Sequence, residues 1–268
     1  MRGMYKFSYR LEGDASRPVT LLLHGFQGCK EDWEALADQL RPDFRTLSVD
    51  LPGHGSTEVA SDEGYRIDTC VGGLIDLLNE LSIKKCHLVA YSMGGRLAFH
   101  MIAKCAHRVD KAVIESASLG IRSEQKRAER MEHDDSLARE LERYGLETFL
   151  QRWYDQPMFA VLKSDHHRFT TMLDRRRHNN SHQLALSLRF MGTGRQQPLL
   201  DEIAKSTVPV LFLAGEHDTK FRQIADELAA TCPSVRSHIV EGAGHTIHFE
   251  KPKLFCNLVR NFLSDTRC

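Results

Sequence analysis

Short apolar runs alternate with helical patterns along most of this chain, and this alternation restricts its fold more than any other feature. Six runs bounded by Gly, Pro, Asp or His have the composition of buried parallel strands. They span residues 19–23, 45–49, 86–90, 111–114, 208–213 and 236–240. Between several of them lie helical patterns, the clearest at 67–81, where apolar residues recur at steps of three and four. Strands joined by helices predict a doubly wound, mostly parallel α/β sheet.

The alternation stops near Ser116 and resumes near Val208. The residues between these points look almost wholly helical, and the stretch 122–143 carries many charges and few apolar residues, as a helix lying over a surface does. We therefore predict an α/β core formed by residues 1–117 and 206–268, with residues 118–205 inserted as a helical cap.

Charge and composition exclude several classes of partner. Lys plus Arg and Asp plus Glu both number 36, so no net field attracts nucleic acid or an acidic membrane. The apolar runs are far shorter than the ~20 residues of a membrane helix, and residues 1–10 lack a signal-peptide core. We expect a cytoplasmic protein without nucleic-acid or membrane partners, whose oligomeric state the sequence leaves open.

The seven cysteines include no CxxC pair and predict reduced thiols, not a disulfide framework or a metal site.

The segment AYSMGG at 90–95 joins a predicted strand to a predicted helix at 96–104. A serine between small residues in such a turn is typical of a nucleophile elbow, in which tight backbone geometry exposes the hydroxyl above the sheet. Ala90 stands where the usual G-x-S-x-G motif has Gly, a departure of one methyl group. In the alternative interpretation, Ser92 only caps the following helix.

A serine nucleophile needs a base, and the base needs a carboxylate that fixes its tautomer. Asp218 and His245 each follow a predicted strand, where open α/β sheets place their sites, and the chain order Ser92, Asp218, His245 suits an α/β hydrolase. Glu216 is an alternative acid and His248 an alternative base.

Two glycine-rich turns follow other predicted strands. In HGFQG at 24–28, the backbone N–H of Phe26 is expected to stabilise a developing oxyanion, together with the backbone N–H of Met93 directly after Ser92. The other turn, DLPGHG at 50–55, is predicted to be mainly structural.

Basic residues gather in the predicted cap. Residues 160–197 contain seven Lys or Arg and two acidic residues in a chain of zero net charge. This local excess favours a small, multiply anionic substrate, although a solvated basic face is the alternative. Arg96 lies one helical turn beyond Ser92, and its guanidinium suits the recognition of a carboxylate in the same cavity.

Together the HGF, GHG and A-x-S-x-G motifs, followed by Asp and His, resemble the α/β-hydrolase superfamily. A closer resemblance rests on YSMGGR, ESASLGI, KRAER, WYDQPMF, RHNN and GEHDTKF, which extend from the core through the cap. These segments resemble the family of 2-succinyl-6-hydroxy-2,4-cyclohexadiene-1-carboxylate synthases of bacterial menaquinone biosynthesis. The resemblance implies an α/β-hydrolase fold, and neither it nor the motifs indicate a cofactor or a metal.

That family eliminates pyruvate from 2-succinyl-5-enolpyruvyl-6-hydroxy-3-cyclohexene-1-carboxylate after proton removal. The resemblance implies that Ser92, Asp218 and His245 form the catalytic triad. It also implies a substrate-binding set of Tyr91, Arg96, Arg130, Trp153, Phe159 and Arg177. The three arginines in this set would hold carboxylates. For Trp153 and Phe159, packing inside the cap remains the alternative. For Arg130, the alternative is an i to i+4 ion pair with Asp134.

Two other function classes remain open at this stage. The same triad permits a serine hydrolase of an acidic ester, thioester or C–C bond, because the substrate's pose decides which reaction occurs. A ligand-binding module without catalysis has no need of all three triad residues. Turnover of simple esters distinguishes the hydrolase from the lyase.

Overall fold

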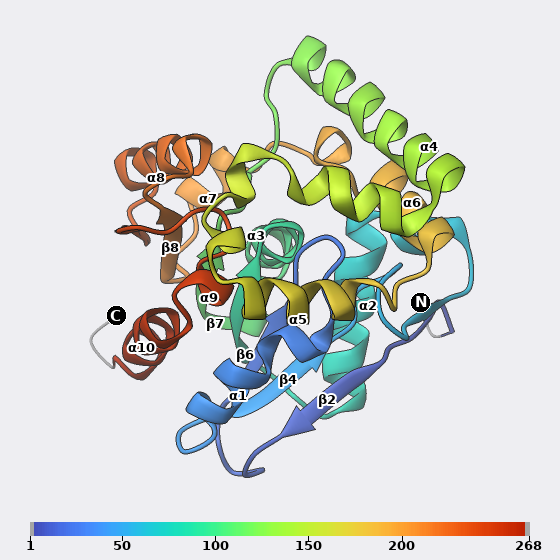
Figure 1. The fold of residues 1–268 in the computed structure, drawn as a ribbon. Coiled ribbons are helices and arrows are strands. Elements are labelled where there is room, and N and C mark those ends of the chain that lie inside the picture. The colour runs from blue at the N-terminus through green and yellow to red at the C-terminus, as the bar shows by residue number, and fades with distance from the viewer. Residues whose placement is uncertain (1–2, 266–268) are drawn as a thin grey trace.

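The computed structural model describes residues 3–265, and a seven-stranded sheet runs through its centre (Figure 1). The strand order is β2-β4-β3-β6-β7-β8-β9, and only the edge strand β2 runs antiparallel to its neighbour. The strands are β1 (Tyr5–Lys6), β2 (Tyr9–Glu12), β3 (Val19–Leu23), β4 (Arg45–Val49), β5 (Glu58–Val59), β6 (Cys86–Tyr91), β7 (Val109–Glu115), β8 (Val210–Gly215) and β9 (Val235–Val240). The predicted doubly wound, mostly parallel α/β fold is confirmed.

Helices cover both faces of this sheet. The helices of the described chain are α1 (Glu34–Leu40), α2 (Ile67–Glu80), α3 (Met93–Cys105), α4 (Glu124–Tyr154), α5 (His166–Arg176), α6 (Ser181–Met191), α7 (Leu200–Ala204), α8 (Thr219–Thr231), α9 (Ile247–Glu250) and α10 (Pro252–Ser264), and not all of them lie on the sheet. In residues 3–265, no helix is both long enough and apolar enough to cross a membrane.

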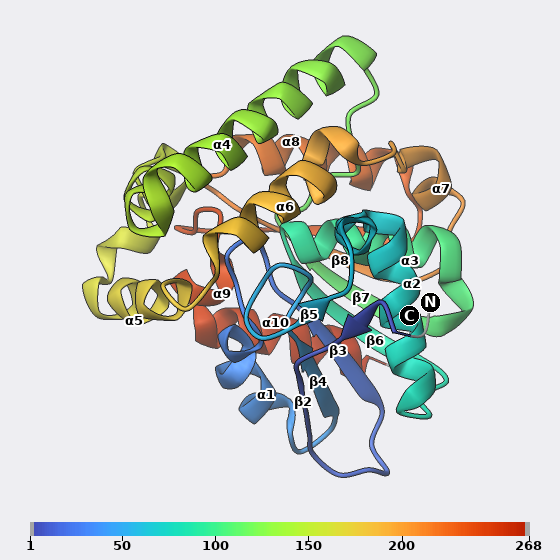
Figure 2. The same ribbon diagram turned by 90° about the vertical axis from the view of Figure 1, so that its right-hand side faces the viewer.

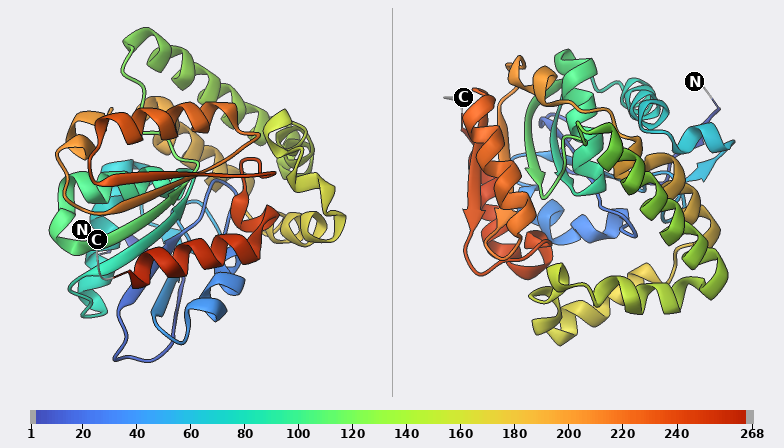
Figure 3. Two further views of the ribbon diagram at one scale, coloured as in Figure 1. Left: turned by 90° about the vertical axis from the view of Figure 1, so that its left-hand side faces the viewer. Right: turned by 90° about the horizontal axis from the view of Figure 1, so that it is seen from above.

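Successive residues of a central strand pack against different helices, because strand side chains alternate between faces. In β3, Leu21 and Leu23 join a cluster with α2, α3 and α8, whereas Leu22 joins a cluster with α1 and α10. All three leucines are fully buried. Figure 3 shows α1 and α10 together on one side of the sheet. Burial on both faces explains why these strands are continuous apolar runs in the sequence.

The segment between β7 and β8 is helical, and its helices differ in what they pack against. Helices α4 and α6 lie side by side (Figure 2) and share a small apolar cluster of their own, which includes Leu141, Phe149 and Leu184. At the end of the segment, Leu200 and Ile203 of α7 instead belong to the main core cluster. The last turns of the segment predicted as a cap are therefore part of the core packing.

Helix α4 is longer than the predicted 122–143 and is interrupted once. Gly145 has φ 78° and ψ 171°, a non-helical conformation inside the helix. This backbone region is essentially restricted to glycine. The interruption divides α4 into two arms, and both arms contribute side chains to the same cavity.

Candidate active site

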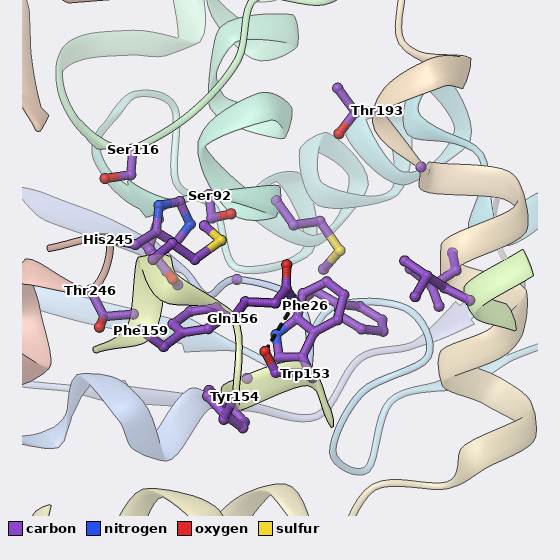
Figure 4. A pocket seen from close by; sticks show the side chains of 18 of the residues that line it. Phe26, Ser92, Ser116, Trp153, Tyr154, Gln156, Phe159, Thr193, His245 and Thr246 are labelled. Atoms are coloured by element: carbon purple, nitrogen blue, oxygen red, sulfur yellow. Dashed lines mark hydrogen bonds between the residues drawn. The ribbon is translucent and has the colours of Figure 1, made fainter. Parts of the chain in front are cut away.

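A cavity of about 610 Å³ lies between the carboxyl ends of the central strands and helices α4, α5 and α6 (Figure 4). Ser92 reaches it from the end of β6, Asp218 from the loop after β8, and His245 from the loop after β9. Trp153 and Phe159 line it from the cap side. The sheet thus brings together three residues that are far apart in sequence.

Ser92 occupies a strained turn. Its φ of 49° and ψ of −105° lie in a region that residues with a side chain rarely adopt, and α3 begins at the next residue. The turn requires close packing: a Cβ on Gly94 would collide with the backbone of Leu23, and one on Gly95 would lie 2.5 Å from the Cβ of Ala117. These contacts give the geometry of a nucleophile elbow, with Ala90 fully buried in the strand before it.

Asp218 and His245 form a short buried pair. His245 Nδ1 lies 2.6 Å from Asp218 Oδ2, and both side chains are 5% exposed. When Nδ1 carries the proton that is donated to Asp218, Nε2 is the free acceptor of the neutral ring. The imidazole is held in position by aromatic rings, with Tyr91 and Phe221 at centroid distances of 5.4 and 5.0 Å.

The alternative acid and base have other partners. Glu216 is exposed and accepts a hydrogen bond from Gly242 N at 2.8 Å. His248 pairs with Glu115, which is fully buried at the end of β7; its Nδ1 lies 2.8 Å from Glu115 Oε2. Both contacts support the loop that carries His245, so Glu216 and His248 act on the geometry of the site from outside it.

The proposed oxyanion turn lies against the elbow. Gly25 is required there, because a Cβ would lie 2.5 Å from Tyr91 Cε1. Met93 is the first residue of α3, so its N–H has no acceptor within the helix. The Phe26 ring also lines the cavity and packs on Trp153 at a centroid distance of 5.2 Å, which joins the turn to the cap.

The loop that contains the DLPGHG motif serves the structure around this turn. The carboxylate of Asp50 is fully buried and accepts hydrogen bonds from Lys30 N at 2.7 Å, Lys30 Nζ at 2.8 Å and Ser56 N at 3.1 Å. A Cβ on Gly55 would collide with this carboxylate.

Two of the predicted arginines line the cavity. Arg96 is 8% exposed, and its Nη1 donates to the carbonyl of Met191 at 2.6 Å. Burial, reinforced by the charge of Arg130, lowers the pKa of Arg96 to about 10. Arg130 Nε donates to Asp134 Oδ1 at 2.8 Å, so the i to i+4 pair is present while Arg130 remains on the cavity wall.

The third predicted arginine lies elsewhere, and that assignment is corrected. Arg177 is exposed, does not line the cavity, and bonds Glu147 at 3.0 Å and Asp174 at 2.6 Å. Its neighbour Arg176 lines the cavity instead, because the last turn of α5 directs consecutive side chains to different sides. Arg176 is buried and forms a two-point ion pair with Asp32, at 2.8 and 3.0 Å.

The remaining predicted substrate residues, Tyr91, Trp153 and Phe159, all line the cavity. Arg176, Tyr154 and Lys220 line it as well, although they were not predicted from the sequence. Tyr154 directly follows Trp153, and Lys220 lies two residues after Asp218, so proximity to predicted site residues was the available signal.

The strand-to-helix serine, the Asp–His pair and the doubly wound sheet together define an α/β hydrolase, and a family model described as alpha/beta hydrolase fold matches residues 18–252. More specific relatives match nearly the full chain. The putative 2-succinyl-6-hydroxy-2,4-cyclohexadiene-1-carboxylate synthase of Bacillus subtilis (strain 168) is 38% identical over 257 residues, which cover 94% of this chain and 93% of the relative. The synthase of Salmonella agona (strain SL483) is 33% identical, with 93% and 95% covered.

A solved structure agrees with these relatives. The structure of MenH from S. aureus superposes with a TM-score of 0.90 at 30% identity and covers 97% of this chain and 98% of its own. The chain therefore belongs to the 2-succinyl-6-hydroxy-2,4-cyclohexadiene-1-carboxylate synthase family, and the predicted resemblance is confirmed. A thermophilic esterase from Thermogutta terrifontis, with a TM-score of 0.82 at 20% identity, shares the fold.

Proposed function

We propose that this protein is a lyase that eliminates pyruvate from 2-succinyl-5-enolpyruvyl-6-hydroxy-3-cyclohexene-1-carboxylate in menaquinone biosynthesis. The product is 2-succinyl-6-hydroxy-2,4-cyclohexadiene-1-carboxylate, as the names of its relatives state. One observation carries the proposal: Ser92 and the Asp218–His245 pair share a single cavity with Arg96, which is buried, and Arg130, which is partly buried.

The charges of this cavity suit a substrate with several carboxylates. The substrate has one on the succinyl group, one on the ring and one on the enolpyruvyl group. Arg96 and Arg130 line the cavity, and planar guanidinium groups can bind a carboxylate through two parallel hydrogen bonds. Arg176 also lines it, but its guanidinium is already paired with Asp32. A neutral ester has no carboxylate to pair with these cations, so it would forgo the charge-assisted hydrogen bonds that favour an anionic substrate.

The proton that is removed lies on C2, next to the succinyl ketone, because the double bond at C3–C4 of the substrate becomes double bonds at C2–C3 and C4–C5 of the product. His245 Nε2 accepts the proton of Ser92, whose oxygen takes the C2 proton. The electron pair of the C2–H bond moves through the ring and expels the enolpyruvyl oxygen from C5. Protonation of the expelled enolpyruvate at its methylene carbon gives pyruvate. Asp218 stabilises the imidazolium while it exists.

Negative charge develops on the succinyl ketone oxygen during this step. The backbone N–H groups of Phe26 and Met93 are proposed to donate hydrogen bonds to it, as an oxyanion hole does in acyl transfer. Because these donors are fixed by the glycine-rich turn and the start of α3, they need no reorganisation as charge develops.

The aromatic side of the cavity limits the access of water. Trp153 packs on Phe26 at 5.2 Å and on Phe149 at 5.6 Å between ring centroids, and Phe159 lies 5.9 Å from the ring of His245. Exclusion of water strengthens the hydrogen bonds to the developing enolate and disfavours hydrolysis.

The test supplies the enolpyruvyl substrate to the purified protein, follows the ultraviolet absorbance of the conjugated diene and quantifies pyruvate. We expect one pyruvate for each diene formed, and slow turnover of a panel of chromogenic esters. Fast ester hydrolysis without release of pyruvate would contradict the proposal and favour a serine hydrolase.

A further inference from the structure

Lys220 differs from every other cation on the wall of the cavity. It is the second residue of α8 and lies two positions after Asp218. Four arginines in the described part of the cavity wall each donate to a protein oxygen; they are Arg96 to Met191 O, Arg130 to Asp134, Arg152 to Glu140 and Arg176 to Asp32. Within residues 3–265, the Lys220 ammonium has no such oxygen partner, and it lies over the ring of its neighbour Phe221, 5.1 Å from the ring centroid.

The charges around Lys220 make this position unfavourable without a ligand. Arg130 on α4 and Arg96 on α3 face it with like charge. The two nearby carboxylates are already engaged, Asp134 by Arg130 and Asp218 by His245. Desolvation at the cavity wall, followed by the charge of Arg130, lowers the pKa of Lys220.

We propose that Lys220 is a substrate-binding residue that holds a carboxylate of the anionic substrate at the Asp218 side of the cavity. The inference rests on the proposed function for the identity of the substrate. Lys220 is an exposed residue that also lines the cavity, so a ligand can approach it from the cavity. A flexible ammonium with three donors suits a carboxylate that is not approached in one fixed plane. A bound carboxylate would also relieve the repulsion between Lys220 and the two arginines.

The test compares Lys220→Met, which removes the charge and keeps the length, with Lys220→Arg, which keeps the charge. Arg222→Met is the matched control, because Arg222 is exposed on the same helix and does not line the cavity. The substitution removes one positive charge, as Lys220→Met does. The probes are tricarballylate, a simple tricarboxylate, and its trimethyl ester. Binding is followed by calorimetry and by the fluorescence of Trp153, which lines the cavity.

We expect Lys220→Met to weaken tricarballylate binding about tenfold or more, as the loss of one charge-assisted hydrogen bond does. Lys220→Arg should retain most of the affinity, Arg222→Met should stay within twofold, and the trimethyl ester should not distinguish the variants. With the enolpyruvyl substrate, KM should rise more than kcat falls, because a binding contact is lost while the triad is intact.

Two further readouts separate binding from support of the fold. Without ligand, Lys220→Met should melt at the same or a higher temperature, because it removes like-charge repulsion. In the wild type, tricarballylate affinity should fall with rising pH at values below the ordinary lysine pKa of ~10.4, because the lowered pKa of Lys220 makes it lose its proton earlier. The charged groups facing Lys220 are Arg130, Asp134, Arg96 and Asp218, and this pH dependence should be weaker in Lys220→Met.

Each contrary result has a definite meaning. Unchanged tricarballylate binding in Lys220→Met, or a lowered melting temperature, would overturn the role of Lys220 alone. No saturable binding to the wild type would overturn that role and the anionic substrate class together. Loss of binding in Lys220→Met with no pyruvate from the wild type would keep Lys220 as a carboxylate ligand and reject the proposed reaction.

Discussion

Ser92 keeps a positive φ of 49° although it is not glycine, and such strain persists only where the surrounding packing enforces it. Its neighbours Gly94 and Gly95 lie too close to other parts of the chain to accept a side chain. Ser92 and His245 both line the cavity (Figure 4). Substitution of Ser92 and of its two partners therefore tests the role of this turn.

Ser92→Ala and His245→Ala should each lower kcat for pyruvate release by about 10⁴ or more, because triad residues act as a unit. Asp218→Asn should be milder, since it disturbs the orientation of the base without removing it. Stopped-flow detection of the diene measures the rates, and melting curves should match the wild type. A folded Ser92→Ala variant with nearly normal kcat would remove the triad from the mechanism.

The arginines provide a second prediction. Neutral Gln variants of Arg96 and Arg130 should each cost ~2 to 5 kcal/mol in kcat/KM, because a substrate carboxylate loses its partner in a desolvated site. Arg177→Gln should change kcat/KM less than threefold, since Arg177 bonds Glu147 and Asp174 outside the cavity. Arg139→Gln on the exposed side of α4 is the control. Equal losses in all four variants would contradict the placement of these cations.

Sequence reasoning found the Ser, Asp and His that share the cavity but missed by one position the arginine of α5 that lines it. Motifs locate Ser92, Asp218 and His245 because tight turns at strand ends demand particular residues in a fixed order. Arg176 and Arg177 are adjacent and chemically identical, and only the packing of α5 decides which one faces the cavity. Charge counting identifies a basic segment, whereas the choice within it depends on tertiary contacts.

At the scale of elements, the interruption of α4 at Gly145 lets one helix line the cavity from two directions. Gly145→Ala should destabilise the protein by ~1 to 3 kcal/mol, since φ 78° with ψ 171° is unfavourable for any residue with a Cβ. The effect is purely conformational, because no atom lies within 4 Å of the added Cβ. We also expect a higher KM.

Chemical denaturation and steady-state kinetics measure both effects. Ser136→Ala, at an exposed position on the first arm of α4, should leave both unchanged. A fully stable Gly145→Ala variant with normal KM would show that the interruption is not needed to shape the cavity.

The elements themselves were predictable to different degrees. All six predicted strands exist, and two of them, β3 and β4, match their predicted bounds, because burial on both faces leaves a continuous apolar run. Edge strand β2 was missed, since Tyr9–Glu12 is only partly buried and pairs on one side with β4. The predicted α4 was also too short. Gly145 follows the predicted end of the helix, and a glycine there is typical of a helix end, whereas the structure continues the helix beyond it.

For the whole molecule, buried histidines make stability depend on pH. Burial lowers the pKa of His54 to about 3 and that of His100 to about 4, below the value of ~6.5 in an unfolded chain. Between these values the unfolded state binds more protons than the folded state, so the free energy of unfolding falls as the pH drops below ~6.5. At its steepest this loss is ~1.4 kcal/mol per pH unit for each such histidine.

Urea unfolding at several pH values between 7 and 4.5 tests this dependence. The free energy of unfolding should fall with pH in the wild type and fall less steeply in His100→Gln, which has one such histidine fewer. The comparison uses slopes, because the substitution also changes packing around a side chain that is 1% exposed. Parallel curves for the two proteins would refute the contribution of His100.

The origin of the cavity wall has a consequence for how such proteins diversify. Ser92, Asp218 and His245 follow strands of the sheet, whereas Arg130, Trp153 and Arg176 all come from the one stretch of chain between β7 and β8. Mutations in that stretch can alter which ligand the cavity accepts without disturbing the turns that hold Ser92, Asp218 and His245. Descendants of such a protein can therefore change in two separate steps. The first alters the ligand that the cavity binds, and the second alters the residues at the strand ends.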